Sequence, residues 1–211
     1  MFVLDEFAAS NQTERADGNR IGLNQMLWDF GLDSFDDEKA IKRKIAEADE
    51  KFHLVMIVER FDESLVLMRH QLCWDLEDMI SLKLNARKAQ QSRIDETTRD
   101  ELKKLLAADY TLYNHFLEIF DRKVQQFGKQ RMEEEVRQLS TANQEVSEKC
   151  KVSAADNRDV PSNARWWGPG LVGYKVNQDS EDCGLMAMAE MSYVERLREI
   201  QNKQIEKTKE T

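Results

Sequence analysis

The chain has 211 residues, a formal net charge of −9 and an isoelectric point near 5.0. Such an acidic surface does not attract nucleic acid or anionic lipid over its whole area, so we expect no nucleic-acid partner. Low glycine and proline contents favour a mostly helical chain, and the length suffices for one hydrophobic core.

No stretch approaches the roughly 20 apolar residues that a membrane-spanning helix needs. The N-terminal residues MFVLDEFAAS also lack the features of a signal peptide. Taken alone, this favours a cytosolic protein. The apolar periodicity that begins at Met1 is also what an internal slice of a larger domain would show, and both interpretations stay open at this point.

Two helices are predicted between residues 21 and 51. Residues 21–30 place apolar side chains near helical spacing, and Gly31 follows as a stop signal. A charged helix over about 36–51 carries Ile41, Ile45 and Ala48 on one face.

Residues 52–58, FHLVMIV, are predicted to form a strand. The run is continuously apolar, so we expect it to be buried on both faces, as in the parallel sheet of an α/β fold. One strand cannot make a sheet. Either further strands are too weakly patterned to recognise, or they lie in sequence outside this chain.

Helices are again predicted beyond this strand. Asp62 has the position of an N-cap, and Glu63 lies in the first turn, where the helix dipole favours an anion. A short helix is expected over 75–84, a long amphipathic helix over 95–127 and a charged helix over 129–150.

Residues 151–184 differ in character because both prolines lie there with four of the eight glycines. The sequence WWGPGLVGY carries too much apolar area for a solvated linker, so we expect an ordered loop or a short hairpin. Residues 185–211 are predicted as a helical tail that begins apolar and ends charged.

The three cysteines form no CxxC pattern and no cluster with histidine, so we expect no bound metal. Cys73 lies on an apolar helical face and is interpreted as a buried thiol. Cys150 and Cys183 flank the loop-rich segment and are the candidate disulfide pair. Asn11 opens a candidate N-glycosylation pattern, which is short enough to occur by chance. These two features favour a secretory compartment, in contrast to the missing signal.

Four charges, Glu59, Arg60, Asp62 and Glu63, follow the predicted strand. Capping accounts for Asp62 and Glu63 but not for Glu59. Ligands of open α/β sheets bind beyond the carboxyl ends of the strands, so Glu59 and Arg60 are candidates for ligand contact. The alternative is a surface role or an ion pair between them. Trp74 is a candidate for stacking on a sugar ring, although a core or loop anchor is the commoner role of tryptophan.

No phosphate-cradling motif of the GxxxxGK[ST] or GxGxxG type is present. The histidines His53, His70 and His115 have no evident catalytic partner in the sequence and are interpreted as structural or solvated. The residues alone therefore indicate a helix-rich piece of an α/β domain without a recognisable reaction centre.

Residues 52–87, FHLVMIVERFDESLVLMRHQLCWDLEDMISLKLNAR, resemble the signature of the galactose-3-O-sulfotransferase family. The family pattern is a strand, then E-x-F-D-E-S-L-V-L-L, L-C-W-[DE]-L-[DE]-D and x-K-L-N-A-R. Asn24, Asp29, Gly31 and Asp33 match its N-x-x-x-x-D-x-G-x-D segment. The resemblance covers nearly the whole chain and is strongest over 52–87.

This resemblance implies an α/β, P-loop-like sulfotransferase fold, with residues 1–211 as a mostly helical C-terminal portion of a single domain. It implies a Golgi membrane glycoprotein that acts on the lumenal side. The reaction would move the sulfuryl group of 3′-phosphoadenosine 5′-phosphosulfate to the 3-hydroxyl of galactose. The acceptor would be a glycolipid, such as a galactosylceramide, or a glycan.

The donor-binding loops and membrane anchor of that family have no counterpart in this sequence. We therefore expect membrane attachment only through an anchor absent from this chain, a catalytic base in the missing N-terminal half, and no activity of the chain alone. Glu59 is the first candidate for a residue near the acceptor, followed by Arg60, Asp62 and Trp74. The alternatives are a non-enzymatic acidic helical interaction protein and a degenerate family member.

Overall fold

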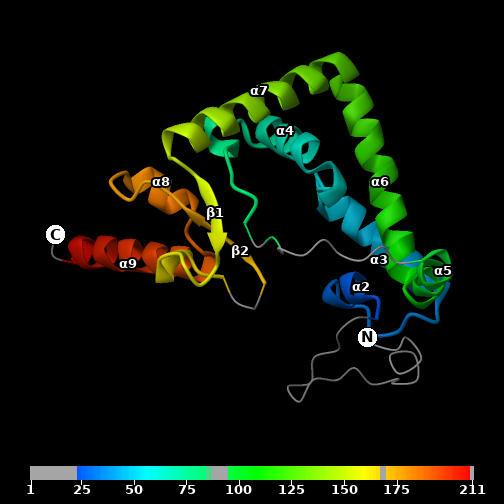
Figure 1. Cartoon of the computed structure of the whole chain (residues 1–211). Helices are drawn as coiled ribbons and strands as arrows, with labels where there is room; N and C mark the ends of the chain where they lie inside the picture. Colours follow the sequence, from blue (N-terminus) through cyan, green and yellow to red (C-terminus); the bar gives the residue numbers. More distant parts are fainter. Residues whose placement is uncertain (1–22, 85, 87–94, 167–169, 210–211) are drawn as a thin grey trace. The chain divides into compact units, whose positions relative to one another are not determined.

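The computed structural model describes residues 23–84, 86, 95–166 and 170–209 (Figure 1). These residues are mostly helical, with one two-stranded antiparallel sheet among them. They fall into two compact units, Met1–Met68 with Ser92–Met132 and Arg69–Gln91 with Glu133–Thr211. None of the helices in the described ranges combines the length and the apolarity needed to cross a membrane.

The first unit is built from helices that pack on one long helix, α6. Its elements are α2 (Gln25–Asp29), α3 (Glu38–Lys51), the 3-10 turn η1 (Val58–Arg60), the start of α4 (Phe61–Leu72), α5 (Glu96–Leu105) and α6 (Ala107–Phe127). Apolar side chains of α2, α3 and α6 form its core, namely Leu27, Ile41, Ile45, Ala48, Leu112 and Phe116. The predicted face of Ile41, Ile45 and Ala48 is thereby confirmed.

Asn24 and Asp109 join α2 to α6 by reciprocal hydrogen bonds. The carboxylate of Asp109 accepts the backbone N–H groups of Met26 at 3.0 Å and Leu27 at 2.9 Å. These donors belong to the first turn of α2, which offers them no partner within the helix. The Asn24 side-chain oxygen in turn accepts the Asp109 N–H at 3.0 Å. Gly31, with φ of 81°, then ends the segment in a conformation that suits glycine.

Residues 52–58 do not form the buried strand that their sequence predicts. The segment is extended at Ile57, with φ −104° and ψ 117°, but no strand pairs with it within the described part of the chain. Ile57 is buried, whereas Val58 is 81% exposed. Apolar residues favour an extended backbone, but a strand also needs a neighbour that accepts and donates its hydrogen bonds, and the described residues supply none.

Three predicted helix boundaries are also corrected. The helix α4 begins at Phe61 directly after η1, so Asp62 lies inside the first turn and is not its N-cap. Only the 3-10 turn η2 (Glu77–Met79) forms within 75–84, where the Asp78 carboxylate accepts the Asp75 N–H at 2.9 Å. The predicted helix over 95–127 is divided at Leu106, whose ψ of 29° interrupts the helical run.

The second unit combines helices with the small sheet. From Glu133 onward it contains α7 (Lys129–Lys149), β1 (Ser153–Asp156), the 3-10 turn η3 (Ser162–Ala164), β2 (Val172–Lys175), α8 (Glu181–Met186) and α9 (Glu190–Lys209). The strands β1 and β2 pair antiparallel (Figure 1). In this pairing Ser153 lies opposite Lys175. The apolar region 151–184 therefore contains a paired sheet.

A disulfide joins Cys150, just after α7, to Cys183 in α8, with their Cα atoms 5.4 Å apart. This is the pair that the sequence positions favoured. Cys73 is a free, exposed thiol, so its interpretation as a buried residue is wrong. Its φ of 54° places it at the end of α4, beyond the regular helix whose periodicity suggested burial.

Candidate functional site

Ser64 ties the start of α4 to the extended segment before it. Its hydroxyl accepts the Ile57 N–H at 3.0 Å and donates to the Ile57 carbonyl at 3.2 Å. Ser64 is fully buried, so these bonds satisfy groups that water does not reach. The serine of the E-x-F-D-E-S signature therefore fixes the loop that carries Glu59 and Arg60.

Arg60 is held by two carboxylates. Its guanidinium forms a two-pronged pair with Glu63, with one contact of 2.7 Å, and a second ion pair with Asp121 of α6. The same group lies 4.9 Å from the ring centre of the buried Phe120. The hydrogen bond to Glu63, opposed by partial burial, raises the pKa of Arg60 above its ordinary value. Arg60 is thus a fixed positioning group whose positive charge is already neutralised.

Glu59 in η1 and Asp62 in the first turn of α4 are both exposed. Burial, followed by the negative charge of Glu59, raises the pKa of the Tyr113 phenol on α6. The structure brings together Arg60, Glu63 and Asp121 through ion pairs, and Tyr113 of α6 responds to the charges of Glu59 and Asp121. Sequence reasoning missed Tyr113 and Asp121 because they lie far along the chain from the signature.

Trp74 occupies a helix-ending turn in the second unit. Its N–H donates to the Arg69 carbonyl at 3.0 Å, and the Arg69 side chain donates to the Trp74 carbonyl at 3.2 Å. Cys73 adopts the left-handed conformation that such caps require. The indole of Trp74 remains 44% exposed, which leaves its ring available for stacking.

The Glu135 carboxylate of α7 contacts Arg69 and His70 near the end of α4. Its Oε2 atom lies 2.6 Å from His70 Nε2 and 3.4 Å from the Arg69 guanidinium. Glu135 is only 9% exposed, so this carboxylate is enclosed with its cationic neighbours. The arrangement connects α4 to α7 within the second unit, and it gives His70 a structural partner as the sequence interpretation expected.

Lys83 and Ala86 of the signature lie against β2. The Tyr174 hydroxyl donates to the Lys83 carbonyl at 3.1 Å, and the Val172 N–H donates to the Ala86 carbonyl at 2.7 Å. Gly173 lies between Val172 and Tyr174 in β2. A Cβ atom at this position would approach Val160 Cγ1 to 2.8 Å, so the close packing requires glycine. The signature segment and β2 are thus adjacent in space, although about 90 residues separate Lys83 from Tyr174.

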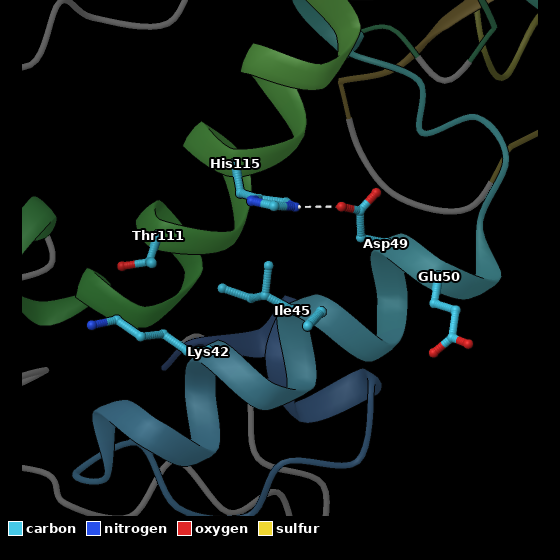
Figure 2. Close-up of a pocket in the computed structure, with 7 residues that line it drawn as sticks. Lys42, Ile45, Asp49, Glu50, Thr111 and His115 are labelled. Atoms are coloured by element: carbon cyan, nitrogen blue, oxygen red, sulfur yellow. Dashed lines mark hydrogen bonds and ion pairs between the residues drawn. The ribbon is translucent and has the colours of Figure 1, made fainter.

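An open groove of about 500 Å³ lies between α3 and α6 (Figure 2). His115 of α6 points toward Asp49 of α3, with its Nε2 atom 3.1 Å from the carboxylate. Lys42 and Ile45 line the groove from α3, and Thr111 lines it from α6. A histidine oriented by a carboxylate can hold or transfer a proton, so this groove presents a candidate acid–base pair.

The four predicted acceptor-side residues fall in different units. Glu59, Arg60 and Asp62 belong to the first unit, and Trp74 belongs to the second. The candidate glycosylation residue Asn11 lies outside the described residues. Within the described ranges, no group of three or more histidine, cysteine, aspartate or glutamate side chains could hold a metal ion.

The family model for galactose-3-O-sulfotransferase matches residues 4–201. The chain belongs to the galactose-3-O-sulfotransferase family. The matched range includes the signature loop at Ser64, the cap at Trp74 and the contact between Lys83 and Tyr174.

The chain is also similar in sequence to curated members of this family. The chain is 35% identical over 193 residues to galactosylceramide sulfotransferase of Mus musculus, covering 82% of this chain and 45% of that protein. It is 30% identical over 221 residues to galactose-3-O-sulfotransferase 2 of Homo sapiens, covering 94% and 55%. It therefore spans about half the length of these curated relatives. No solved structure matches the chain.

Proposed function

We propose that this chain is the C-terminal portion of a galactose 3-O-sulfotransferase domain. The complete enzyme would transfer the sulfuryl group of 3′-phosphoadenosine 5′-phosphosulfate to the 3-hydroxyl of galactose on a glycolipid or a glycan. The observation that carries this proposal is the family match over residues 4–201, which includes both compact units. Relatives named galactosylceramide sulfotransferase support a glycolipid acceptor.

The described signature loop does not fit the sulfate donor. A bound phosphosulfate needs several unpaired hydrogen-bond donors, from cationic side chains or from a glycine-rich loop at a helix N-terminus. Arg60, the cation of the signature loop, is already bound by Glu63 and Asp121. We therefore expect the donor to be bound by residues that correspond to the part of the relatives not covered by this chain.

We propose Glu59 as the residue of this loop that faces the acceptor. Its exposed carboxylate can accept hydrogen bonds from sugar hydroxyl groups. Arg60 would position this loop through its pairs with Glu63 and Asp121, and Ser64 would hold the loop to the backbone of Ile57. Asp62 and Trp74 are exposed and remain proposed acceptor-side residues.

We propose for the whole domain the α/β, P-loop-like fold that the family resemblance implies. The proposed location is the lumenal side of the Golgi membrane. The Cys150–Cys183 disulfide supports an oxidising compartment, because disulfides persist there and are rare in the cytosol.

The test is a sulfate-transfer assay on the full gene product with a panel of galactose-terminated glycolipids and glycans. Transfer to at least one galactoside is expected. A folded full gene product that transfers sulfate to none of them would point instead to a degenerate family member or a non-enzymatic helical protein.

A further inference from the structure

A second pocket, of about 530 Å³, lies in the second unit beside the disulfide. We call it the disulfide pocket. Its residues come from the η2 region, the end of α7, α8 and the start of α9. The apolar part of its wall is formed by the disulfide with Ile80, Val146, Leu185 and Met186.

Three charged side chains line the same pocket: Glu77, Asp182 and Lys149. All three are exposed, and within the described chain none of them makes a hydrogen bond or an ion pair through its side chain. Their neighbours differ, because Glu181 pairs with Arg196 and the Asp78 carboxylate accepts a backbone N–H. The charges of the pocket are therefore available to a ligand and are not used to hold the fold.

Tyr193, at the start of α9, adds an aromatic ring to this wall. It is 41% exposed, so one part of the ring packs on the protein and the rest faces solvent. An exposed ring beside unpaired polar groups and an apolar wall can recognise a ligand that has both an apolar face and several hydroxyl groups.

A neutral sugar has this combination of surfaces. The axial 4-hydroxyl of galactose leaves the C–H groups of C3, C4 and C5 together on one face, which can stack on an aromatic ring. Carboxylates accept hydrogen bonds from hydroxyl groups, and an ammonium group donates to them. Two carboxylates against one lysine make the pocket net negative, which disfavours an anionic ligand such as the phosphosulfate donor.

We propose that the disulfide pocket binds the galactose ring of the acceptor. In this arrangement Tyr193 stacks on the C–H face of the sugar, while Glu77 and Asp182 accept hydrogen bonds from its hydroxyl groups. The disulfide fixes α8 to the end of α7 and so holds Asp182 and Lys149, the neighbours of its two cysteines, in one pocket. The proposal rests on the proposed function for the choice of galactose, and it names where this chain contributes to acceptor recognition.

The test is saturation-transfer NMR on the 211-residue chain with methyl β-galactoside, and with methyl β-glucoside as the comparison sugar. We expect saturable binding of the galactoside and weaker binding of the glucoside. Tyr193→Ala and Asp182→Asn should each weaken galactoside binding by about tenfold or more, since stacking and charged hydrogen bonds each contribute on this scale.

Matched controls separate the pocket from the general surface. Tyr110→Ala removes another partly exposed tyrosine, and Glu181→Gln changes the carboxylate next to Asp182 in the sequence without touching the pocket lining. Both should leave galactoside affinity within about twofold, as surface substitutions usually do. No galactoside binding by the unchanged chain, or equal binding by both pocket variants, would overturn the proposal.

The same variants distinguish failure of the pocket from failure of the proposed function. If the full gene product transfers sulfate and Tyr193→Ala and Asp182→Asn leave the KM for the acceptor unchanged, the pocket is refuted and the enzyme remains. If the chain binds galactoside through Tyr193 but the full gene product transfers no sulfate, the pocket stands and the proposed reaction is refuted.

Discussion

The hydroxyl of Ser64 bridges both backbone groups of Ile57, at 3.0 Å from its nitrogen and 3.2 Å from its oxygen. Ile57 is the last residue of the extended segment, and the buried Ser64 side chain supplies the hydrogen bonds that a neighbouring strand would otherwise provide to it. The loop between these two residues carries Glu59 and Arg60. The geometry of the candidate acceptor-side loop therefore depends on a serine that itself faces the interior.

Ser64→Ala should destabilise the first unit, because it leaves the N–H and C=O of Ile57 buried without their partner. Loss of such bonds costs about 1–3 kcal/mol. The free energy of unfolding, measured by urea denaturation, should fall by this amount. The control is Ser140→Ala on the exposed face of α7, which should change it by less than about 0.5 kcal/mol. Equal stabilities of the two variants would argue against a structural role for Ser64.

Gly173→Ala should lower the melting temperature of the chain and weaken the contact between β2 and the signature segment. The added Cβ would meet Val160 Cγ1 at 2.8 Å and the Asn157 Cα at 3.1 Å. Overpacking of this kind costs about 1–3 kcal/mol. Gly184→Ala is the matched control, since a Cβ there meets nothing within 4 Å. A Gly173→Ala variant as stable as Gly184→Ala would mean that β2 does not pack against Val160 and Asn157 as described.

Arg60→Ala should destabilise the chain by about 1–2 kcal/mol, because it leaves Glu63 and Asp121 as unbalanced carboxylates and removes a charged hydrogen bond. Arg60→Lys should recover only part of this loss, since lysine keeps the charge but cannot form the two-pronged pair. Arg137→Ala is the control, because the Arg137–Glu134 pair is largely exposed and worth well under about 1 kcal/mol. Thermal unfolding of the three variants measures the difference, and equal losses for Arg60→Ala and Arg137→Ala would contradict the clamped arginine.

The order of α5 should depend on pH through Asp95. Hydrogen bonds from the Thr98 backbone and hydroxyl, both at 2.9 Å, lower the pKa of this capping carboxylate below its ordinary value. A lowered folded-state pKa means that the cap is fully effective above the unfolded pKa and is lost as pH falls through the folded pKa. Amide exchange in α5 should therefore be slow near neutral pH, after correction for intrinsic rates, and less protected in acid.

Asp95→Asn isolates the charge from the cap, because asparagine also caps helices but does not titrate in this range. In this variant the protection of α5 should vary much less with acid than in the unchanged chain. An unchanged acid response in Asp95→Asn would show that another group controls the end of this helix.

Sequence patterns predicted the features of this fold that depend on residues close together in the chain. The buried face of Ile41, Ile45 and Ala48 follows from their helical spacing, and the turn at Gly31 follows from the freedom of glycine at positive φ. The family resemblance over 52–87 was equally visible, because the motif is a continuous run of residue types.

The features that sequence missed depend on partners far along the chain. Asp109 caps α2 from 82 residues away, and Asp49 meets His115 across 66 residues. The apolar run at 52–58 indicated an extended backbone but not whether a strand would pair with it. The ion pair between Arg60 and Asp121 could not be predicted either, because 61 residues separate the two in the sequence.

The most direct test of this account is sulfate transfer from labelled 3′-phosphoadenosine 5′-phosphosulfate by the full gene product, with paired acceptors that differ only at the galactose 3-hydroxyl. The proposed enzyme labels a galactoside with a free 3-hydroxyl and does not label its 3-O-methyl derivative, and Glu59→Gln lowers kcat/KM for that acceptor without unfolding the protein. Equal labelling of the two acceptors, or no labelling of any galactoside by the folded protein, would contradict the central claim.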